Sequence, residues 1–216
     1  MRISICIPTY NRAAHLSNCL QSIVSNKSRF TIDFEVCVSD NCSTDGTEKV
    51  VRRVQADMDI RYQKNSENLG VPGNFINVVA MARGEFVWLL GDDDLLMPYA
   101  LEKLNILIDS HPRVDFFYVN AYFLTAEFVQ SFPQPFNTVN LPKKLKPFSS
   151  WSNSGEMEFM DLVDPKISFD FLGGMYLSVF RRENWKQNVG VLDDSAVKDR
   201  RIFSHFDNTF PQLKIF

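Results

Sequence analysis

Short apolar runs alternate with longer stretches of helical periodicity between residues 3 and 124, and this alternation limits the folds open to the chain. Residues 3–7 form a buried strand pattern that Pro8 stops, and residues 12–25 then repeat apolar side chains at helical spacing. Buried strands separated by helices indicate βαβ units, because a parallel sheet is covered on both faces. The sequence therefore predicts an α/β fold, Rossmann-like, with a mostly parallel central sheet and helices on both faces.

The later elements follow the same alternation as far as residue 124. Further strands are predicted over 34–38, 60–62, 85–90, 114–124 and 175–180, and further helices over 45–54, 72–82, 98–108 and just after residue 182. Residues 125–147 show no periodicity and contain four prolines, so we expect a long functional loop or lid there. We expect a single domain over 1–216, divided into halves at 1–124 and 125–216.

The bulk properties exclude several classes of partner. The 216 residues carry a formal net charge of −3 and no basic stripe, so we expect no nucleic acid partner. No apolar run reaches the roughly 18 residues of a membrane span, and no signal-peptide pattern opens the sequence. The four cysteines lack CxxC spacing, and Cys6 and Cys37 lie in apolar runs, so we expect reduced thiols and a cytoplasmic location. The apolar end at 213–216 leaves open a longer natural chain.

Polar side chains follow three of the predicted strands at the points where those strands end. They are residues 9–12 (Thr-Tyr-Asn-Arg), residues 40–41 (Asp-Asn) and residues 92–94 (Asp-Asp-Asp). Ligands of open parallel sheets bind beyond the carboxyl ends of the strands. We therefore expect these clusters, which lie far apart in sequence, to share one rim of the sheet.

The acidic run of Asp92, Asp93 and Asp94 follows the apolar strand directly. Adjacent carboxylates repel, and Mg²⁺ or Mn²⁺ relieves that repulsion while sharing its remaining oxygen ligands with substrate phosphates. Such a metal would neutralise a departing diphosphate. The alternative is that Asp94 caps the helix that begins near Pro98 while the other two carboxylates are solvated.

The other two clusters offer groups that suit a nucleoside. Asp40 could accept a hydrogen bond from a nucleobase edge, and Thr9 and Asn11 offer short polar groups to a ribose or base. For Asp40 the alternative is an Asx turn that closes the strand. For Thr9 and Asn11 it is a cap between strand and helix.

The segments around these clusters resemble family-2 glycosyltransferases of the GT-A fold. In chain order they are residues 5–12 (ICIPTYNR), 38–47 (VSDNCSTDGT), 68–70 (NLG), 82–86 (ARGEF) and 92–94 (DDD). The match covers roughly residues 1–110, and five ordered motifs make it specific. The resemblance implies an enzyme that transfers a sugar from a nucleoside diphosphate sugar to a hydroxyl acceptor, with a divalent metal (Mn²⁺ or Mg²⁺) as cofactor.

By the same resemblance, residues 1–124 form the nucleotide-sugar-binding half and residues 125–216 the acceptor-side half. The donor-binding positions that it implies are Pro8, Thr9, Tyr10, Asn11, Asp40, Asn68, Gly70, Asn74, Asp92 and Asp93. The acidic motif of the family often reads Asp-x-Asp-Asp. Here Gly91 takes the place of the first Asp, so Asp93 becomes the metal ligand and Asp92 its helper.

A second departure from the family follows Gly70. Many members carry an Arg-Asn pair that reads Phe75-Ile76 here, so a phosphate contact is missing or has moved to Asn74. This substitution resembles the abequosyltransferase-like branch, which transfers deoxysugars in the assembly of bacterial surface polysaccharide (O-antigen, capsule or lipopolysaccharide). The acceptor it implies is a saccharide or a lipid-linked saccharide.

In inverting members of the family, the catalytic base is an acidic residue that follows a Gly-rich strand and an Arg-Arg stretch. Residues 173–174, 181–182, 190 and 193–194 resemble that stretch, which makes Asp207 the candidate to deprotonate the acceptor hydroxyl. A helix cap at Asp207 is the alternative. Asp199 is a weaker rival. His205 is interpreted as a structural or rim residue, with a metal or phosphate contact as the alternative.

The remaining aromatic and basic residues favour ordinary roles. Trp88 is predicted in the core, and core packing is also favoured over sugar stacking for the aromatic residues at 128, 132, 136, 151 and 185. The lysines at 143, 144 and 146 beside Phe148 indicate either a solvated charge run or peripheral contact with the inner face of the plasma membrane. Two other functions stay open: a sugar nucleotidyltransferase, disfavoured because residues 9–14 hold no glycine, and a non-catalytic nucleotide-sugar-binding module.

Overall fold

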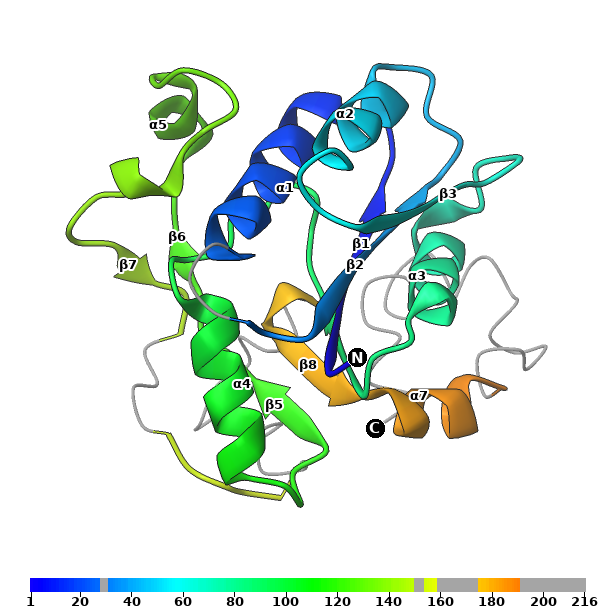
Figure 1. Ribbon diagram of the computed structural model, residues 1–216, viewed down its shortest axis with the longest axis vertical. Coiled ribbons are helices and arrows are strands. Elements are labelled where there is room, and N and C mark those ends of the chain that lie inside the picture. The colour runs from blue at the N-terminus through cyan, green and yellow to red at the C-terminus, as the bar shows by residue number, and fades with distance from the viewer. Residues whose placement is uncertain (28–30, 150–153, 159–174, 191–216) are drawn as a thin grey trace.

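The computed structural model describes residues 1–27, 31–149, 154–158 and 175–190 of the chain (Figure 1). Within them the main sheet has the order β3-β2-β1-β4-β8-β5. Its strands are β1 (Ile3–Thr9), β2 (Phe34–Asp40), β3 (Ile60–Lys64), β4 (Phe86–Leu89), β5 (Phe116–Tyr118) and β8 (Ser178–Arg181). The helices around it are α1 (Ala13–Lys27), α2 (Thr47–Val54), α3 (Gly70–Met81), α4 (Ala100–Ser110) and α7 (Arg182–Asn188).

The pairing of the strands confirms the predicted mostly parallel α/β sheet. Strands β1, β2, β3 and β4 run parallel to one another, and β8 lies antiparallel between β4 and β5. β8 comes from the second half of the chain, so the described parts of both halves share one sheet. The chain order reverses at β1, which places the carboxyl ends of β1, β2 and β4 beside one another.

The sheet is covered on both faces, as the alternation of side chains along β1 demands. Ile3, Ile5 and Ile7 pack into one buried cluster with side chains of α1, α2 and α4. Cys6 points the other way, into a second cluster with side chains of α3 and α7. Figure 1 shows α3 and α7 on the side of the sheet opposite α1 and α4. Cys6 and Cys37 are buried free thiols, as predicted.

Strand β1 does not stop at Pro8, and this prediction is wrong. The strand continues to Thr9, with Pro8 opposite Ser39 and Thr9 opposite Asp40 of β2. Pro8 lacks an N–H, but its backbone faces the β4 side, where pairing has already ended with the bond from the Leu90 N–H to the Cys6 carbonyl. The missing donor therefore costs nothing here, and the strand delivers Thr9 directly to the rim.

The close approach of residue 84 to β1 explains why the segment before β4 carries a glycine. A Cβ at this position would lie 2.7 Å from the backbone nitrogen of Ser4, so only glycine fits against β1. The Gly84 N–H donates to the Ser4 hydroxyl, and that hydroxyl donates to the buried Glu35 at 2.6 Å. The Arg83 N–H donates to the same Glu35 oxygen. The segment thus ties β4 to β1 and β2 before the acidic run begins.

Residues 114–149 differ from the prediction. The expected strand over 114–124 is two strands in different sheets, since β6 (Tyr122–Phe123) pairs with β7 (Lys146–Pro147). The expected loop over 125–147 also holds α5 (Ala126–Gln130) and a 3-10 turn, η1 (Thr138–Asn140). The phenylalanines at 128, 132 and 136 pack on one another, and Phe136 is fully buried, with its N–H bonded to Asn18 of α1. These elements are too short for a search by periodicity to find.

The remaining segments agree more closely with the predictions. The strand expected over 175–180 is a 3-10 turn, η3 (Met175–Leu177), followed by β8. Trp88 lies in the core, as predicted, and its indole N–H donates to the Tyr176 carbonyl. The lysines at 143, 144 and 146 lie on or next to β7, where the Lys146 ammonium sits 5.6 Å from the centre of the Phe123 ring. Among the described helices, none is long and apolar enough to cross a membrane.

Candidate active site

The ends of β1 and β4 meet at the rim through a direct hydrogen bond. Thr9 is the last residue of β1, and its hydroxyl donates to Asp92 at 2.7 Å. Asp40, the last residue of β2, lies opposite Thr9 in the register of the two strands. The three polar clusters that the sequence placed on one rim are therefore together in the structure.

The three carboxylates of the acidic run have different surroundings. Asp92 is buried, whereas the Asp93 side chain is 50% exposed. One guanidinium joins them: Arg12 Nε lies 3.2 Å from Asp92 and its terminal nitrogen donates to Asp93 at 2.7 Å. Asp94 turns back and accepts the N–H of Gly91 at 2.9 Å. Asp94 thus anchors its own loop, and the alternative in which it caps the next helix is wrong, because α4 begins after Tyr99 without a side-chain cap.

Two carboxyls of the run, those of Asp92 and Asp94, have raised pKa values. Burial raises the pKa of Asp92 above its ordinary value, and Asp93 adds to this, whereas the Thr9 hydroxyl and Arg12 act in the opposite direction. Burial, followed by the charge of Asp93, raises the pKa of Asp94 to about 7. The run thus sets three neighbouring carboxyls against one guanidinium, and a further cation there would favour the ionised forms of Asp92 and Asp94.

The position of the Asp94 carboxylate explains why residue 91 is a glycine in this chain. A Cβ at residue 91 would lie 2.5 Å from a carboxylate oxygen of Asp94 and 3.0 Å from one of Asp93. The family's aspartate at this position would therefore displace the carboxylate of Asp94. The inward turn of Asp94 therefore depends on the glycine that departs from the acidic motif of the family.

Asp40 lies beneath the surface, and each of its carboxylate oxygens accepts a hydrogen bond from the protein. One of its oxygens accepts the Ser43 N–H and the other accepts the Tyr62 hydroxyl, both at 2.7 Å. The Asp40 side chain is buried. Partial burial of the Tyr62 hydroxyl, together with its bond to Asp40, raises the pKa of Tyr62. The bond to Ser43 reaches the N–H three residues on, whereas the Asx turn named as the alternative would reach two residues on, so it closes the loop after the strand in a different way. It does not test nucleobase binding, because each carboxylate oxygen has a second lone pair.

The loop after β2 is held against the loop after β1. Asn11 has a left-handed backbone, with φ of 52°, its N–H donates to the Ser43 hydroxyl, and its side chain accepts the Thr44 N–H. Asp45 accepts the N–H of Ala13 and that of Thr47, so it serves the first turns of both α1 and α2. Although burial opposes it, these hydrogen bonds lower the pKa of Asp45.

A network of amide side chains fixes the segment before α3. Asn41 donates to Asn68, which in turn accepts the N–H of Gly70, where φ is +72°. Asn74 is buried and both ends of its amide are bonded, to Ser39, Asn65 and the carbonyl of Thr9. In this arrangement Asn68, Gly70 and Asn74 shape the rim. Their contact with the donor stays a prediction, as does the phosphate contact of Asn74.

Asp93 and Asp92 fit a divalent metal that takes part of its coordination from a diphosphate. They supply two hard oxygen donors, one of them half-exposed, at a point with excess negative charge. Within the described residues no group of three or more His, Cys, Asp or Glu could hold a metal alone. A metal here would therefore rely on the ligand for the rest of its shell.

The other predicted positions divide into two sets. Tyr10 is 44% exposed beside the half-buried Pro8, so both border the rim. The candidate base Asp207, its rivals Asp199 and His205, and residues 173–174 and 193–194 lie outside the described residues.

Sequence reasoning missed the roles of Arg12 and Tyr62. Arg12 belonged to the first family motif, but no role was predicted for it, and its partners lie 80 and 81 residues away. Tyr62 lies on β3, where its alternation gave no sign of a polar contact. The signal that could have found both is the topology, which places β3 beside β2 and the start of α1 over the end of β4.

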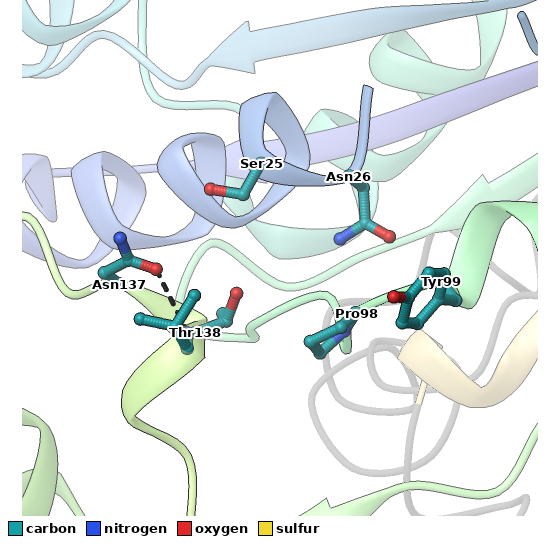
Figure 2. Close-up of a pocket in the computed structure, with 7 residues that line it drawn as sticks. Ser25, Asn26, Pro98, Tyr99, Asn137 and Thr138 are labelled. Carbon is teal, nitrogen blue, oxygen red and sulfur yellow. Dashed lines mark hydrogen bonds between the residues drawn. The ribbon is translucent and has the colours of Figure 1, made fainter. Parts of the chain in front are cut away.

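A cavity of about 200 Å³ lies away from this rim, between the end of α1, the start of α4 and η1 (Figure 2). It is lined by Ser25, Asn26, Pro98, Tyr99, Asn137, Thr138 and Val139. These side chains include no carboxylate, imidazole or basic group. The cavity therefore offers none of the groups that the rim brings together.

Relatives of known name match about half of the chain. The abequosyltransferase RfbV of Salmonella typhimurium is 45% identical over 116 residues, which are 53% of this chain and 34% of that protein. A beta-1,3-glucosyltransferase of Campylobacter jejuni that acts on GalNAc(5)-diNAcBac-PP-undecaprenol is 39% identical over 105 residues, or 48% of this chain and 33% of that one. The chain thus spans about a third of the length of these relatives.

Solved structures match over more of the chain at lower identity. TarS of Staphylococcus aureus in complex with UDP-GlcNAc has a TM-score of 0.59 and 22% identity, covering 88% of this chain and 48% of that chain. The mannosyltransferase PcManGT of Pyrobaculum calidifontis, with GDP-Man and Mn²⁺, has a TM-score of 0.54 and 19% identity, covering 86% and 46%. These similarities establish the GT-A fold.

Residues 4–181 match the family described as Glycosyl transferase family 2, a span that runs from β1 to the end of β8. The match includes each of the three clusters on the rim and the arginine that joins two of the carboxylates. The chain belongs to glycosyl transferase family 2.

Proposed function

We propose that the chain transfers a sugar from a nucleoside diphosphate sugar to a hydroxyl acceptor, with inversion at the anomeric carbon and with a divalent metal. One observation carries the proposal: Thr9, Arg12 and the Asp92–Asp93 pair converge at the carboxyl ends of β1 and β4. This is the edge of an open α/β sheet at which ligands bind. It combines carboxylates for a metal with a guanidinium for phosphate.

The donor's diphosphate would lie over the acidic run. Asp93, with Asp92 as helper, would hold Mn²⁺ or Mg²⁺, which when bound supplies positive charge to the departing diphosphate. Thr9 holds the Asp92 carboxylate in place through its hydrogen bond. PcManGT, a structural neighbour, was solved with GDP-Man and Mn²⁺, which supports this choice of ligand and metal.

The nucleoside would lie along the rim between β1 and β2. Tyr10 and Asn11 are exposed there, with Pro8 beside them, and Asp40 lies beneath with one lone pair left on each oxygen. A base that bonds to Asp40 has to enter beside the Tyr62 hydroxyl. Asn68, Gly70 and Asn74 hold the adjoining wall through the amide network.

The acceptor hydroxyl would be deprotonated by Asp207 and would attack the anomeric carbon from the face opposite the leaving diphosphate. The acceptor is proposed to be a saccharide or a lipid-linked saccharide in bacterial polysaccharide assembly. The relative from Campylobacter jejuni, whose name includes an undecaprenol-linked saccharide, supports this class. A cytoplasmic enzyme with peripheral membrane contact through the lysines at 143, 144 and 146 would suit such an acceptor.

Thermal-shift measurements with UDP, GDP, CDP and dTDP, each with and without Mn²⁺, test the donor site. A ligand that binds the native state raises the melting temperature by mass action. We expect one diphosphate to stabilise the protein in a way that depends on Mn²⁺. Absence of stabilisation by all four diphosphates with Mn²⁺ would contradict the proposal.

Turnover distinguishes the rival functions. A transferase releases the nucleoside diphosphate from its sugar donor, whereas a nucleotidyltransferase makes a sugar nucleotide from a sugar phosphate and a nucleoside triphosphate. A binding module binds the donor without either reaction. An Asp207→Asn variant that binds the donor but no longer transfers supports Asp207 as the base, and one with the full rate contradicts that assignment.

A further inference from the structure

Arg12 already occupies the carboxylates that the metal would use. Its Nε lies 3.2 Å from Oδ1 of Asp92, and its terminal nitrogen lies 2.7 Å from Oδ2 of Asp93. The second oxygen of Asp92 accepts the Thr9 hydroxyl. A single guanidinium thus spans both members of the pair.

A divalent cation and this guanidinium are competitors. Both are attracted by the same two carboxylates, and each repels the other at the separations involved. Asp92 is buried, so its charge is screened less by solvent than that of a surface carboxylate. A metal that binds alone must therefore displace or tolerate Arg12.

The backbone around Arg12 is fixed, whereas its side chain is not enclosed. The N–H of Asn11 is bonded to Ser43, and the N–H of Ala13 to Asp45, so the residues on both sides are anchored to the loop after β2. The Arg12 side chain is 42% exposed. Leaving the carboxylates requires only rotation of the side chain, and a guanidinium pairs with phosphate oxygens as well as with carboxylates.

We propose that Arg12 couples metal binding to donor binding: it pairs with Asp92 and Asp93 in the absence of ligand, and it transfers to the diphosphate when the metal and the donor bind together. This inference rests on the proposed function of the same site. When the metal binds alone, Arg12 gives up its contacts with Asp92 and Asp93 and gains no new partner. When the diphosphate binds as well, its oxygens become the new partners of Arg12. Each ligand therefore raises the affinity for the other by the same factor.

The affinity for Mn²⁺, measured by the electron paramagnetic resonance signal of free Mn²⁺ with and without saturating UDP, tests the coupling. If another diphosphate of the thermal-shift panel stabilises the protein more, it replaces UDP. In the wild type we expect the diphosphate to lower the Mn²⁺ dissociation constant at least tenfold. Arg12→Gln should bind Mn²⁺ alone about tenfold more tightly, because the competing cation is gone. The diphosphate should then improve that affinity by a factor about tenfold smaller than in the wild type, because only its direct coordination of the metal remains.

Two further variants complete the design. Arg12→Lys keeps the charge but cannot span both carboxylates, so its coupling should lie between those of the wild type and Arg12→Gln. Arg52→Gln removes an equal charge from an exposed residue paired with Glu48 on α2 and should behave as the wild type does. Because this readout follows the metal, a purely structural role of Arg12 would not move it.

The outcomes separate this inference from the proposed function. If Arg12→Gln and Arg12→Lys both keep the wild-type Mn²⁺ affinity and coupling, the role of Arg12 is wrong and the donor site stands. A wild type that binds the diphosphate with no effect on Mn²⁺ also overturns the coupling alone. A wild type that binds neither Mn²⁺ nor any diphosphate overturns both.

Discussion

Asp40 and Asp93 lie on the same rim, yet the protein surrounds their carboxylates differently. Asp40 is buried and accepts hydrogen bonds from Ser43 and Tyr62, within a network that also fixes the loops after β1 and β2. The Asp93 side chain is half-exposed, and among the described residues it pairs with the partly exposed Arg12. Asp40 therefore supports the fold and keeps one lone pair on each oxygen, whereas Asp93 has most of its bonding capacity left for a ligand. Substitutions should therefore damage stability at Asp40 and ligand binding at Asp93.

The largest expected effect separates activity from stability at Asp93. Asp93→Ala should reduce sugar transfer at least about a hundredfold, because it removes a ligand of the metal that stabilises the departing charge. Its unfolding free energy should stay within about 0.5 kcal/mol of the wild type, as for other exposed substitutions. Steady-state rates and urea unfolding check the two halves of this prediction. A folded variant with at least a third of the wild-type rate would contradict the metal-ligand role.

Asp40→Ala should, unlike Asp93→Ala, lower the free energy of unfolding. It leaves the Ser43 N–H and the Tyr62 hydroxyl without their acceptor beneath the surface, so we expect a loss of about 2–3 kcal/mol in unfolding free energy. Urea unfolding measures the loss, and Asp59→Ala, at an exposed aspartate just before β3, serves as control. Equal stability of the Asp40 variant and the control would show that the network does not support the rim.

Tyr62→Phe sharpens the same point with a smaller change. It removes one hydrogen bond to Asp40 and keeps the ring, so the expected loss is about 1 kcal/mol. If the hydroxyl occupies part of the nucleobase position, the variant should also bind the nucleoside diphosphate no more weakly than the wild type. Calorimetric titration measures this affinity, and a tenfold weaker affinity would instead assign the hydroxyl a direct contact with the ligand.

Gly91→Ala is the smallest of these changes, with an expected loss of about 1 kcal/mol. The added Cβ conflicts with the end of the Asp94 side chain, which can move away if it gives up its bond to the Gly91 N–H. At Gly190 an added Cβ meets no atom of the described residues within 4 Å, so Gly190→Ala provides the matched control. A crystal structure of Gly91→Ala with Asp94 unmoved would contradict the proposed dependence of Asp94 on glycine.

The sequence predicted the rim because strand ends are marked by local chemistry. Buried runs ending in Thr9, Asp40 and residues 92–94 can be read from hydrophobicity alone, and parallel topology brings such ends together. The family motifs added order and roles. The fold class and the placement of these clusters are confirmed by the structure, and the family by the match over residues 4–181.

Other features could not be read from local pattern. The Arg12 ion pairs depend on side-chain conformation across 80 residues, and the inward turn of Asp94 depends on the space above Gly91. The segment 125–147 gave no periodicity because its elements are only a few residues long, and Phe136 is anchored by a distant partner, Asn18. Tertiary contacts decide each of these.

Calorimetric titration of the nucleoside diphosphate in the presence of Mn²⁺, into the wild type and into Asp93→Ala, tests the central claim that the rim binds donor diphosphate and metal together. The account predicts at least tenfold weaker binding to Asp93→Ala, and an equal weakening when EDTA is added to the wild type. Equal affinities for the wild type and Asp93→Ala, each unchanged by EDTA, would contradict it.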